Sequence, residues 1–241
     1  MRELGERLRG IPGDRGHDGQ FLNALSEAGV SFLDVRFADL PGRWHHVTVP
    51  LEALSASFFA LGVGFDGSSA GFKSVESGDM VLLPDRSTTV VEDVAGRSVA
   101  AVIATAAEAD SRRPFPLDPR VILRQAGAAL EASGHADESI WSPELEFYVF
   151  EGASYACGRS GAYYEVESLD AGWLDPESPE ASRGFRIPAG CGYDAMPPAD
   201  AHWALRNEIA LRMGDAGIPV KYHHHENGAP GQMEIEIVGE P

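Results

Sequence analysis

Carboxylates that alternate with apolar side chains in two distant runs are the residues whose spacing points to chemistry. Glu144 and Glu146 alternate with Leu, Phe and Val, and Glu234 and Glu236 alternate with Met and Ile. Because successive side chains of a strand point to opposite faces, each pair of acids shares one face and the apolar residues fill the other. Acids on a solvent-exposed strand face would give the same pattern, so the pairs alone do not decide between a surface and a site.

The second run carries a stronger signal, because a His-His-His-Glu sequence at residues 223–226 precedes it. Gly228, Pro230 and Gly231 predict a turn that folds Glu226 back beside Glu234 as a hairpin. Two carboxylates held close together repel each other unless a cation lies between them. Oxygen-rich ligation favours Mg²⁺ or Mn²⁺ over zinc. The alternative is a cluster of polar or surface histidines. We predict a metal-assisted site.

The composition narrows the class of protein. The 241 residues carry a formal net charge of −18, which argues against nucleic acid and anionic membrane surfaces as partners and for attraction of cations. Two cysteines without zinc spacing indicate a reducing compartment. The polar N-terminus has no apolar targeting core, and no run is long enough to span a membrane. We therefore expect a cytoplasmic protein.

Several segments have the patterns of the elements that would position the acids. Asp118 and Pro119 predict the start of a helix over 120–132 that ends at Gly134. Strands are predicted over 140–150, 220–224 and 232–238, and an amphipathic helix over 201–213. The region from about 150 to 192 has little periodicity and is too long for an ordinary connection, so we expect either a functional excursion or irregular structure.

The N-terminal part reads as a small α+β domain. Residues 1–17 are expected to be a loose lead-in, 30–37 and 44–49 a β-hairpin, and 51–61 a helix. Short strands are predicted at 80–83, 88–91 and 100–104. We place the end of this domain near residue 113, before a linker at 114–117.

Five motifs in order along the chain resemble those of the glutamine synthetase family, type I. Each is modest alone, and Asp66 by itself reads as a turn residue, but the ordered series is specific. The motifs are a strand pair (34–37 and 41–50), a Phe-Asp-Gly-Ser-Ser latch (65–69, with 79–80 and 83–85), Pro-Glu-Leu-Glu-Phe (143–147), a substrate loop (192–193 and 197–200), and His-His-Glu with Gly-Gln-Met-Glu (224–226 and 231–234).

The resemblance implies a fold and a set of site residues. It implies an α+β chain with a β-grasp-like domain over 1–113 and, over 114–241, an incomplete antiparallel-sheet catalytic domain with packed helices. Roles follow residue by residue: Glu146, Glu226 and Glu234 would bind one Mg²⁺ or Mn²⁺, Glu144 would bind a second, and Asp66, Asp79 and Tyr193 would form the ammonium pocket.

The resemblance also implies an activity. ATP would phosphorylate the γ-carboxylate of glutamate, and ammonia would then attack the acyl phosphate to give glutamine, in a homo-oligomeric ring. Because family members are longer, we expect the chain to be a fragment that ends early at Pro241 and is inactive alone. Asn227, Pro230 and Cys191 depart from the family pattern. Two alternatives stay open: a γ-glutamyl ligase for a small organic amine or polyamine, and a non-catalytic paralogue that binds metal or assembles.

Overall fold

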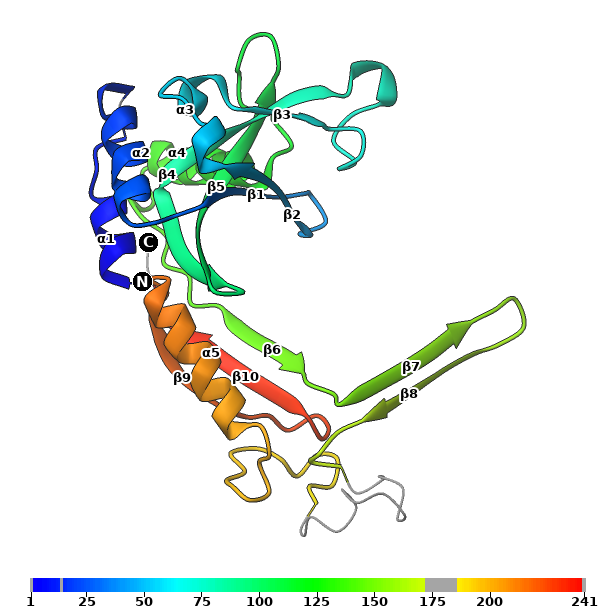
Figure 1. Cartoon of the computed structure of the whole chain (residues 1–241). Coiled ribbons are helices and arrows are strands. Elements are labelled where there is room, and N and C mark those ends of the chain that lie inside the picture. The colour runs from blue at the N-terminus through cyan, green and yellow to red at the C-terminus, as the bar shows by residue number, and fades with distance from the viewer. Residues whose placement is uncertain (1, 14, 172–185, 240–241) are drawn as a thin grey trace. The chain divides into compact units, whose positions relative to one another are not determined.

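The computed structural model divides the chain into two compact units, Met1–Ser139 and Ile140–Pro241 (Figure 1). It describes residues 2–13, 15–171 and 186–239. Part of the stretch expected to be irregular and the end of the chain at Pro241 lie outside the described residues. The architecture is mixed α+β, as the sequence predicts, and each unit is described by itself below.

The first unit is built on a five-stranded sheet with the strand order β2-β1-β5-β4-β3. The predicted hairpin is present, since β1 and β2 pair antiparallel, while β1 and β5 pair parallel. The two strands predicted at 80–83 and 88–91 are one long strand, β4, whose register with β5 shifts between Asp85 and Val90. The strands are β1 (Phe32–Ala38), β2 (Trp44–Pro50), β3 (Val63–Asp66), β4 (Asp79–Val94) and β5 (Arg97–Glu108).

The N-terminal residues are helical, in contrast to the loose lead-in expected from their charge. Within residues 1–17, helix α1 spans Arg2–Arg9 and a short 3-10 turn lies at Arg15–His17; helix α2 (Asp18–Glu27) follows this segment. Leu8 is fully buried in the core of the unit, Leu4 packs against that core, and the Arg9 guanidinium donates to the Thr89 carbonyl at 2.7 Å. These contacts hold a segment that its overall polarity had marked as irregular.

The segment predicted as a helix over 51–61 is interrupted. It forms a 3-10 turn at Leu51–Ala53 and a single α-turn, α3, at Phe58–Leu61. Between them the hydroxyls of Ser55 and Ser57 hydrogen-bond each other at 2.8 Å. Serines compete for local hydrogen bonds and favour turns, which explains the break. A further 3-10 turn lies at Val75–Ser77.

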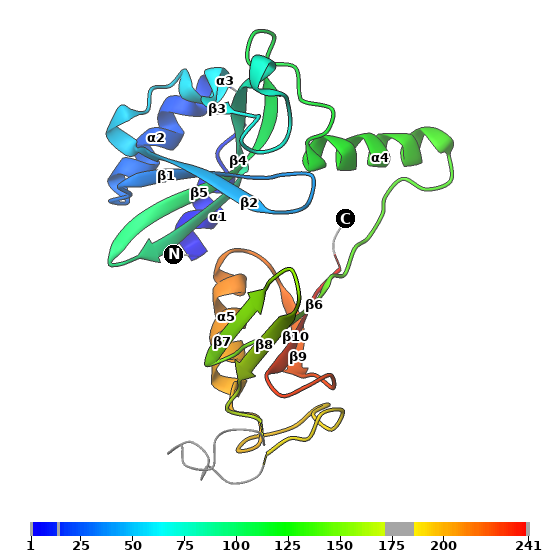
Figure 2. The same ribbon diagram turned by 90° about the vertical axis from the view of Figure 1, so that its right-hand side faces the viewer.

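Helix α4 (Pro119–Ser133) has the boundaries that its capping residues predict. The Asp118 carboxylate accepts hydrogen bonds from the amides of Arg120 and Val121, and Gly134 closes the helix in the left-handed conformation, with φ of 69°. Figure 2 shows α4 as the long helix that comes after β5 in the chain.

The second unit contains a three-stranded antiparallel sheet in the order β6-β10-β9. Its strands are β6 (Glu144–Tyr148), β9 (Val220–His225) and β10 (Gln232–Ile237), and helix α5 (Trp203–Asp215) packs on one face (Figures 1 and 2). The apolar side chains of the alternating run, Met233 and Ile235, are buried. Alternation therefore leaves the acids of this run on the face away from the helix.

A second hairpin lies in the region expected to be irregular. Strands β7 (Gly152–Cys157) and β8 (Ala162–Glu167) pair antiparallel and extend away from the three-stranded sheet (Figure 1). Its outer tyrosines, Tyr155 and Tyr164, are 82% and 80% exposed. The sequence signal was weak because no apolar face is buried along this hairpin, so apolar and polar residues do not alternate.

Among the described residues, no helix combines the length and the apolar character needed to cross a membrane.

Candidate metal centre

The acids of the two alternating runs meet on one face of the β6-β10-β9 sheet. Glu234, on the central strand, lies opposite Glu146 of β6 on one side and His224 of β9 on the other. Glu236 lies opposite Glu144 in the same way. The sheet therefore places in two adjacent rows residues that are up to 92 positions apart (236 minus 144) in the sequence.

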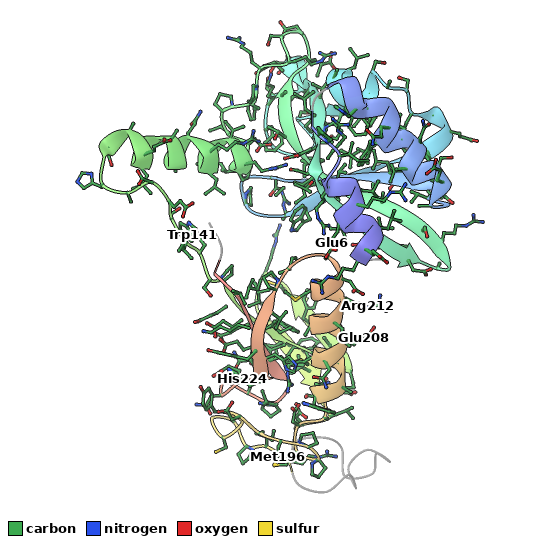
Figure 3. The ribbon with its side chains drawn as sticks, turned by 90° about the vertical axis from the view of Figure 1, so that its left-hand side faces the viewer. Glu6, Trp141, Met196, Glu208, Arg212 and His224 are labelled. Atoms are coloured by element: carbon green, nitrogen blue, oxygen red, sulfur yellow. The ribbon has the colours of Figure 1, made fainter. Side chains whose placement is uncertain are left out.

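Three of these side chains form a compact cluster at the end of the β9–β10 hairpin (residues 220–237). The imidazole of His224 lies between two carboxylates: Nδ1 is 3.5 Å from Glu226 Oε2, and Nε2 is 3.6 Å from Glu234 Oε2. One donor atom from each residue lies within 4.8 Å of the others. Figure 3 labels His224 on the strands of the second unit.

The spacing and charge of the cluster fit a small divalent cation. Donor atoms bound to a cation at about 2.1 Å lie about 3 to 4 Å from one another. The donor atoms of the cluster lie within 4.8 Å of one another, so they would have to move only slightly closer to bind one cation. Burial and the neighbouring carboxylate of Glu226 raise the pKa of the Glu234 carboxyl. A cation would remove that repulsion. The two carboxylates and one imidazole suit Mg²⁺ or, with the nitrogen donor, Mn²⁺.

Glu146 borders the cluster but is held by another residue. Its Oε2 accepts a hydrogen bond of 2.9 Å from the side-chain amide of Gln232. Glu144 is exposed on the edge strand. Beside it, Glu236 pairs with Lys221 at 2.7 Å, and this bond lowers the pKa of the Glu236 carboxyl. The four predicted ligands thus divide into two in the cluster, Glu226 and Glu234, and two on the neighbouring strand.

Tyr193, predicted for the ammonium pocket, lies beside the cluster. Its ring contacts that of His224 edge-on, with centroids 5.2 Å apart. The loop reaches this position because Gly192 packs directly on the hairpin: a Cβ there would lie 2.5 Å from the His225 ring and 2.7 Å from the Glu226 carbonyl oxygen. A glycine is therefore required at this point of the loop.

Asp66 and Asp79, the other residues predicted for that pocket, belong to the first unit. They are directly opposite each other at the paired ends of β3 and β4. Asp66 accepts hydrogen bonds from the hydroxyls of Ser68 and Ser69, which lower the pKa of its carboxyl. The turn interpretation of the Asp-Gly-Ser-Ser segment therefore describes its local structure, and both acids remain exposed.

His224 was not predicted as a member of the cluster. Glu226 was expected to face Glu234 directly, whereas the pairing places His224 opposite Glu234, and Glu226 lies beyond the strand end with its amide bonded to the Gln232 carbonyl. The signal was present, because positions 224 and 226 share a face in an extended segment. His223 and His225 share the other face of the strand.

Two buried polar groups support the hairpin from behind. Arg206 of α5 forms a two-point ion pair with Asp200, both side chains being buried, and its Nε lies 3.4 Å from His223 Nδ1. The ring of His225 contacts the carboxylate of Asp170. Burial lowers the pKa of His225, but the bonds to Asp170 and to the Glu226 carbonyl outweigh it and leave the pKa raised.

Comparison with known families accounts for nearly all of the chain. Residues 29–108 match the glutamine synthetase β-grasp domain, and residues 116–240 match the glutamine synthetase catalytic domain. The second match includes all the strands that carry the cluster.

Individual relatives agree with this assignment. The chain is 35% identical over 218 residues to a glutamine synthetase of Methylococcus capsulatus, and 34% identical over 219 residues to one of Aquifex aeolicus. Each match covers 90% of this chain and 46% of the relative, so the chain spans about half the length of these proteins. The fold resembles that of Plasmodium falciparum glutamine synthetase, with a TM-score of 0.81 at 20% identity over 92% of this chain and 44% of that one.

Proposed function

The chain belongs to the glutamine synthetase family, and from this premise we propose that it forms part of an ATP-dependent ligase that joins glutamate to ammonia. The observation that carries the proposal is the cluster of His224, Glu226 and Glu234, which lies on the strands of the matched catalytic domain and has the spacing of a divalent-cation site. The reaction would proceed through γ-glutamyl phosphate, and the product would be glutamine.

The acids on the face of the sheet away from α5 would hold the cations that assist phosphoryl transfer. Glu226 and Glu234, joined by Glu146, would hold one Mg²⁺ or Mn²⁺, and Glu144 would supply one ligand to a second. A bound cation neutralises charge that develops on the transferring phosphoryl group. The hydrogen-bonded pairing of β6 with β10 holds the backbones of Glu144, Glu146 and Glu234 side by side in one sheet, and the bond from the Glu226 amide to the Gln232 carbonyl holds Glu226 beside them.

The amine would be handled by a separate set of residues. Tyr193, which packs on His224, would line the ammonium pocket. Asp66 and Asp79 would bind ammonium and accept its proton, since a carboxylate both stabilises the cation and serves as a general base. We propose that they act in the site of a neighbouring subunit, within a homo-oligomeric ring.

The test is product formation by the full protein that contains this chain. It would be incubated with glutamate, ATP, Mg²⁺ or Mn²⁺, and either ammonia, methylamine or a polyamine, and the γ-glutamyl product and ADP would be measured. We expect ammonia-dependent glutamine and ADP in equal amounts, lost in Glu226→Gln and kept in the exposed hairpin variant Glu165→Gln. Product only with methylamine or a polyamine would replace glutamine synthesis by the γ-glutamyl-amine alternative. Cation binding without ADP formation from any amine would support the non-catalytic alternative.

A further inference from the structure

A buried carboxylate behind the β9–β10 hairpin has no part in the cluster itself. Asp170 follows β8 in a tight turn, closed by the bond from the Ala171 amide to the Ser168 carbonyl, and all three residues are at most 1% exposed. A buried acid requires hydrogen bonds or a cationic neighbour to be tolerated, and Asp170 Oδ2 faces His225 Nε2 at 3.2 Å and His202 Nε2 at 3.8 Å. The groups that supply these bonds to Asp170 come from three other segments.

The Asp170 carboxylate joins the start of the α5 segment to both ends of the metal-bearing turn. Oδ1 accepts the amide of Ala201 at 2.8 Å. Oδ2 accepts the amide of Gly231 at 3.2 Å and faces His225 Nε2 at 3.2 Å. His225 immediately precedes Glu226, and Gly231 lies three positions before Glu234. One carboxylate oxygen therefore bridges the two ends of the turn that lies between the candidate ligands.

We propose that Asp170 is a positioning residue that holds Glu226 and Glu234 at the separation a single divalent cation requires. The proposal rests on the metal centre assigned above. Asp170 touches neither ligand, and its effect is transmitted through the backbone of the turn. Partners of this kind, one step behind the ligands, commonly change metal affinity by about 10- to 100-fold when they are removed.

The turn has little freedom to compensate for loss of this carboxylate. Gly231 has φ of +86°, and a Cβ at this residue would lie 2.5 Å from the Val149 carbonyl oxygen and 2.9 Å from the Ser168 hydroxyl. Its own carbonyl is engaged by the Val149 amide at 2.9 Å. Without Asp170, the Gly231 amide would be a buried donor with no acceptor, so the turn would have to move to reach one.

The other end of the turn is held just as closely. His225 is fully buried, and both of its ring nitrogens face oxygens: Nε2 faces Asp170, and Nδ1 lies 2.8 Å from the Glu226 carbonyl oxygen. A ring whose two nitrogens both face oxygens has its orientation fixed, and through Nδ1 it is tied to the peptide that follows Glu226. Asp170 therefore acts on the Glu226 backbone through His225 and on the Glu234 strand through Gly231.

The chain contains a matched control for a purely structural role. Asp118 in the first unit is also a buried carboxylate that binds three N–H groups, those of Ala106, Arg120 and Val121. Asp118→Asn should destabilise its unit as Asp170→Asn destabilises the second unit. Only Asp170→Asn should alter the geometry of the metal-bearing turn, because its new amide hydrogens would oppose the donors of Gly231 or His225.

The experiment measures Mn²⁺ binding by electron paramagnetic resonance and amide hydrogen exchange, on the same chain and below its unfolding temperature. We expect Asp170→Asn to weaken Mn²⁺ binding by about 10- to 100-fold and to accelerate exchange at residues 226–232, with Asp118→Asn unchanged in both. Asp170→Ser, which adds no bulk and keeps one acceptor, should behave like Asp170→Asn. Wild-type affinity and exchange in folded Asp170→Asn would overturn the proposal.

Hydrogen exchange separates this proposal from the metal assignment on which it rests. If the wild-type chain bound no Mn²⁺ while Asp170→Asn still released the turn, the metal centre would be wrong and the positioning contact real. If neither variant of Asp170 folded, the wild-type protein would still decide the question. Its Gly231 amide should exchange as slowly as the amides within β10, and exchange at the rate of an exposed loop would overturn the proposal.

Discussion

Replacing Glu234 by Gln should change stability in opposite directions with and without a divalent cation. In the metal-free protein, the carboxylates of Glu234 and Glu226 have donor atoms within 4.8 Å of each other, and the raised pKa of Glu234 reflects this proximity and its burial. Two unit charges at that distance repel by about 1 kcal/mol in a water-like dielectric and about 3 kcal/mol at an effective dielectric constant of 20. The lower value is appropriate because His224 lies between them.

With a cation present, Glu234→Gln should instead be less stable than wild type. A ligand at 100 times its dissociation constant stabilises the folded state by about 2.7 kcal/mol. Wild type should gain this amount from Mn²⁺ and Glu234→Gln almost none. The variant should therefore be about 1 kcal/mol more stable than wild type in chelator and about 2 kcal/mol less stable in Mn²⁺.

Urea denaturation of the two proteins, each in EDTA and in Mn²⁺, measures both differences. The exposed control Glu165→Gln should match wild type in both conditions. If Glu234→Gln were less stable than wild type in EDTA, the two carboxylates would not repel each other in the metal-free fold. If Mn²⁺ stabilised the variant as much as wild type, Glu234 would not be a ligand. Either result would refute the assignment of the cluster.

Three further predictions concern the scaffold. Asp200→Ala should lower the free energy of unfolding by about 3–5 kcal/mol, because it leaves the buried Arg206 guanidinium without its partner; urea denaturation measures this, and a loss below 1 kcal/mol contradicts it. Gly192→Ala should cost about 1–3 kcal/mol by overpacking the hairpin and weaken Mn²⁺ binding, whereas Gly161→Ala, with open space around it, should bind Mn²⁺ normally. The bond from His45 and those from Arg43 lower the pKa of the Asp39 carboxyl to about 2 from its ordinary 3.8, so its stabilisation is complete above pH 3.8 and disappears as the pH falls towards 2. Asp39→Asn should lack this component of the acid dependence of the unfolding midpoint, and an unchanged acid profile would contradict the assignment.

How far the sequence predicted this structure depended on whether a local pattern controlled each segment. Helix α4 was predicted nearly to its ends because Asp118 and Gly134 cap it through their own side chain and backbone. Helix α1 was missed because its high charge outweighed a short apolar pattern: Leu4 and Leu8, four positions apart, both pack on the core of the first unit. Two apolar residues in eight are a weak periodic signal in a polar segment.

The candidate metal site was likewise predicted where a local pattern controls it and missed where strand pairing or tertiary contacts do. The turn signal of Gly228, Pro230 and Gly231 correctly placed Glu226 and Glu234 near each other, but register decides which residues are opposite, and His224 rather than Glu226 is the partner of Glu234. A one-residue change of register exchanges the two faces of a strand. Asp170 could not be found from the sequence at all, because its partners are 31, 55 and 61 positions away in the chain.

The β9–β10 hairpin has a consequence for the order in which this unit folds. The three clustered donors lie between residues 224 and 234 of one hairpin, whereas Glu146 joins them across a sequence separation of 86 residues through its bond to Gln232. Closing a short loop costs far less chain entropy than closing a long one. A cation can therefore be captured while β6 is still unpaired, and a bound cation would then favour the docking of Glu146. Divalent metal would act on the folding rate of this unit as well as on its equilibrium stability.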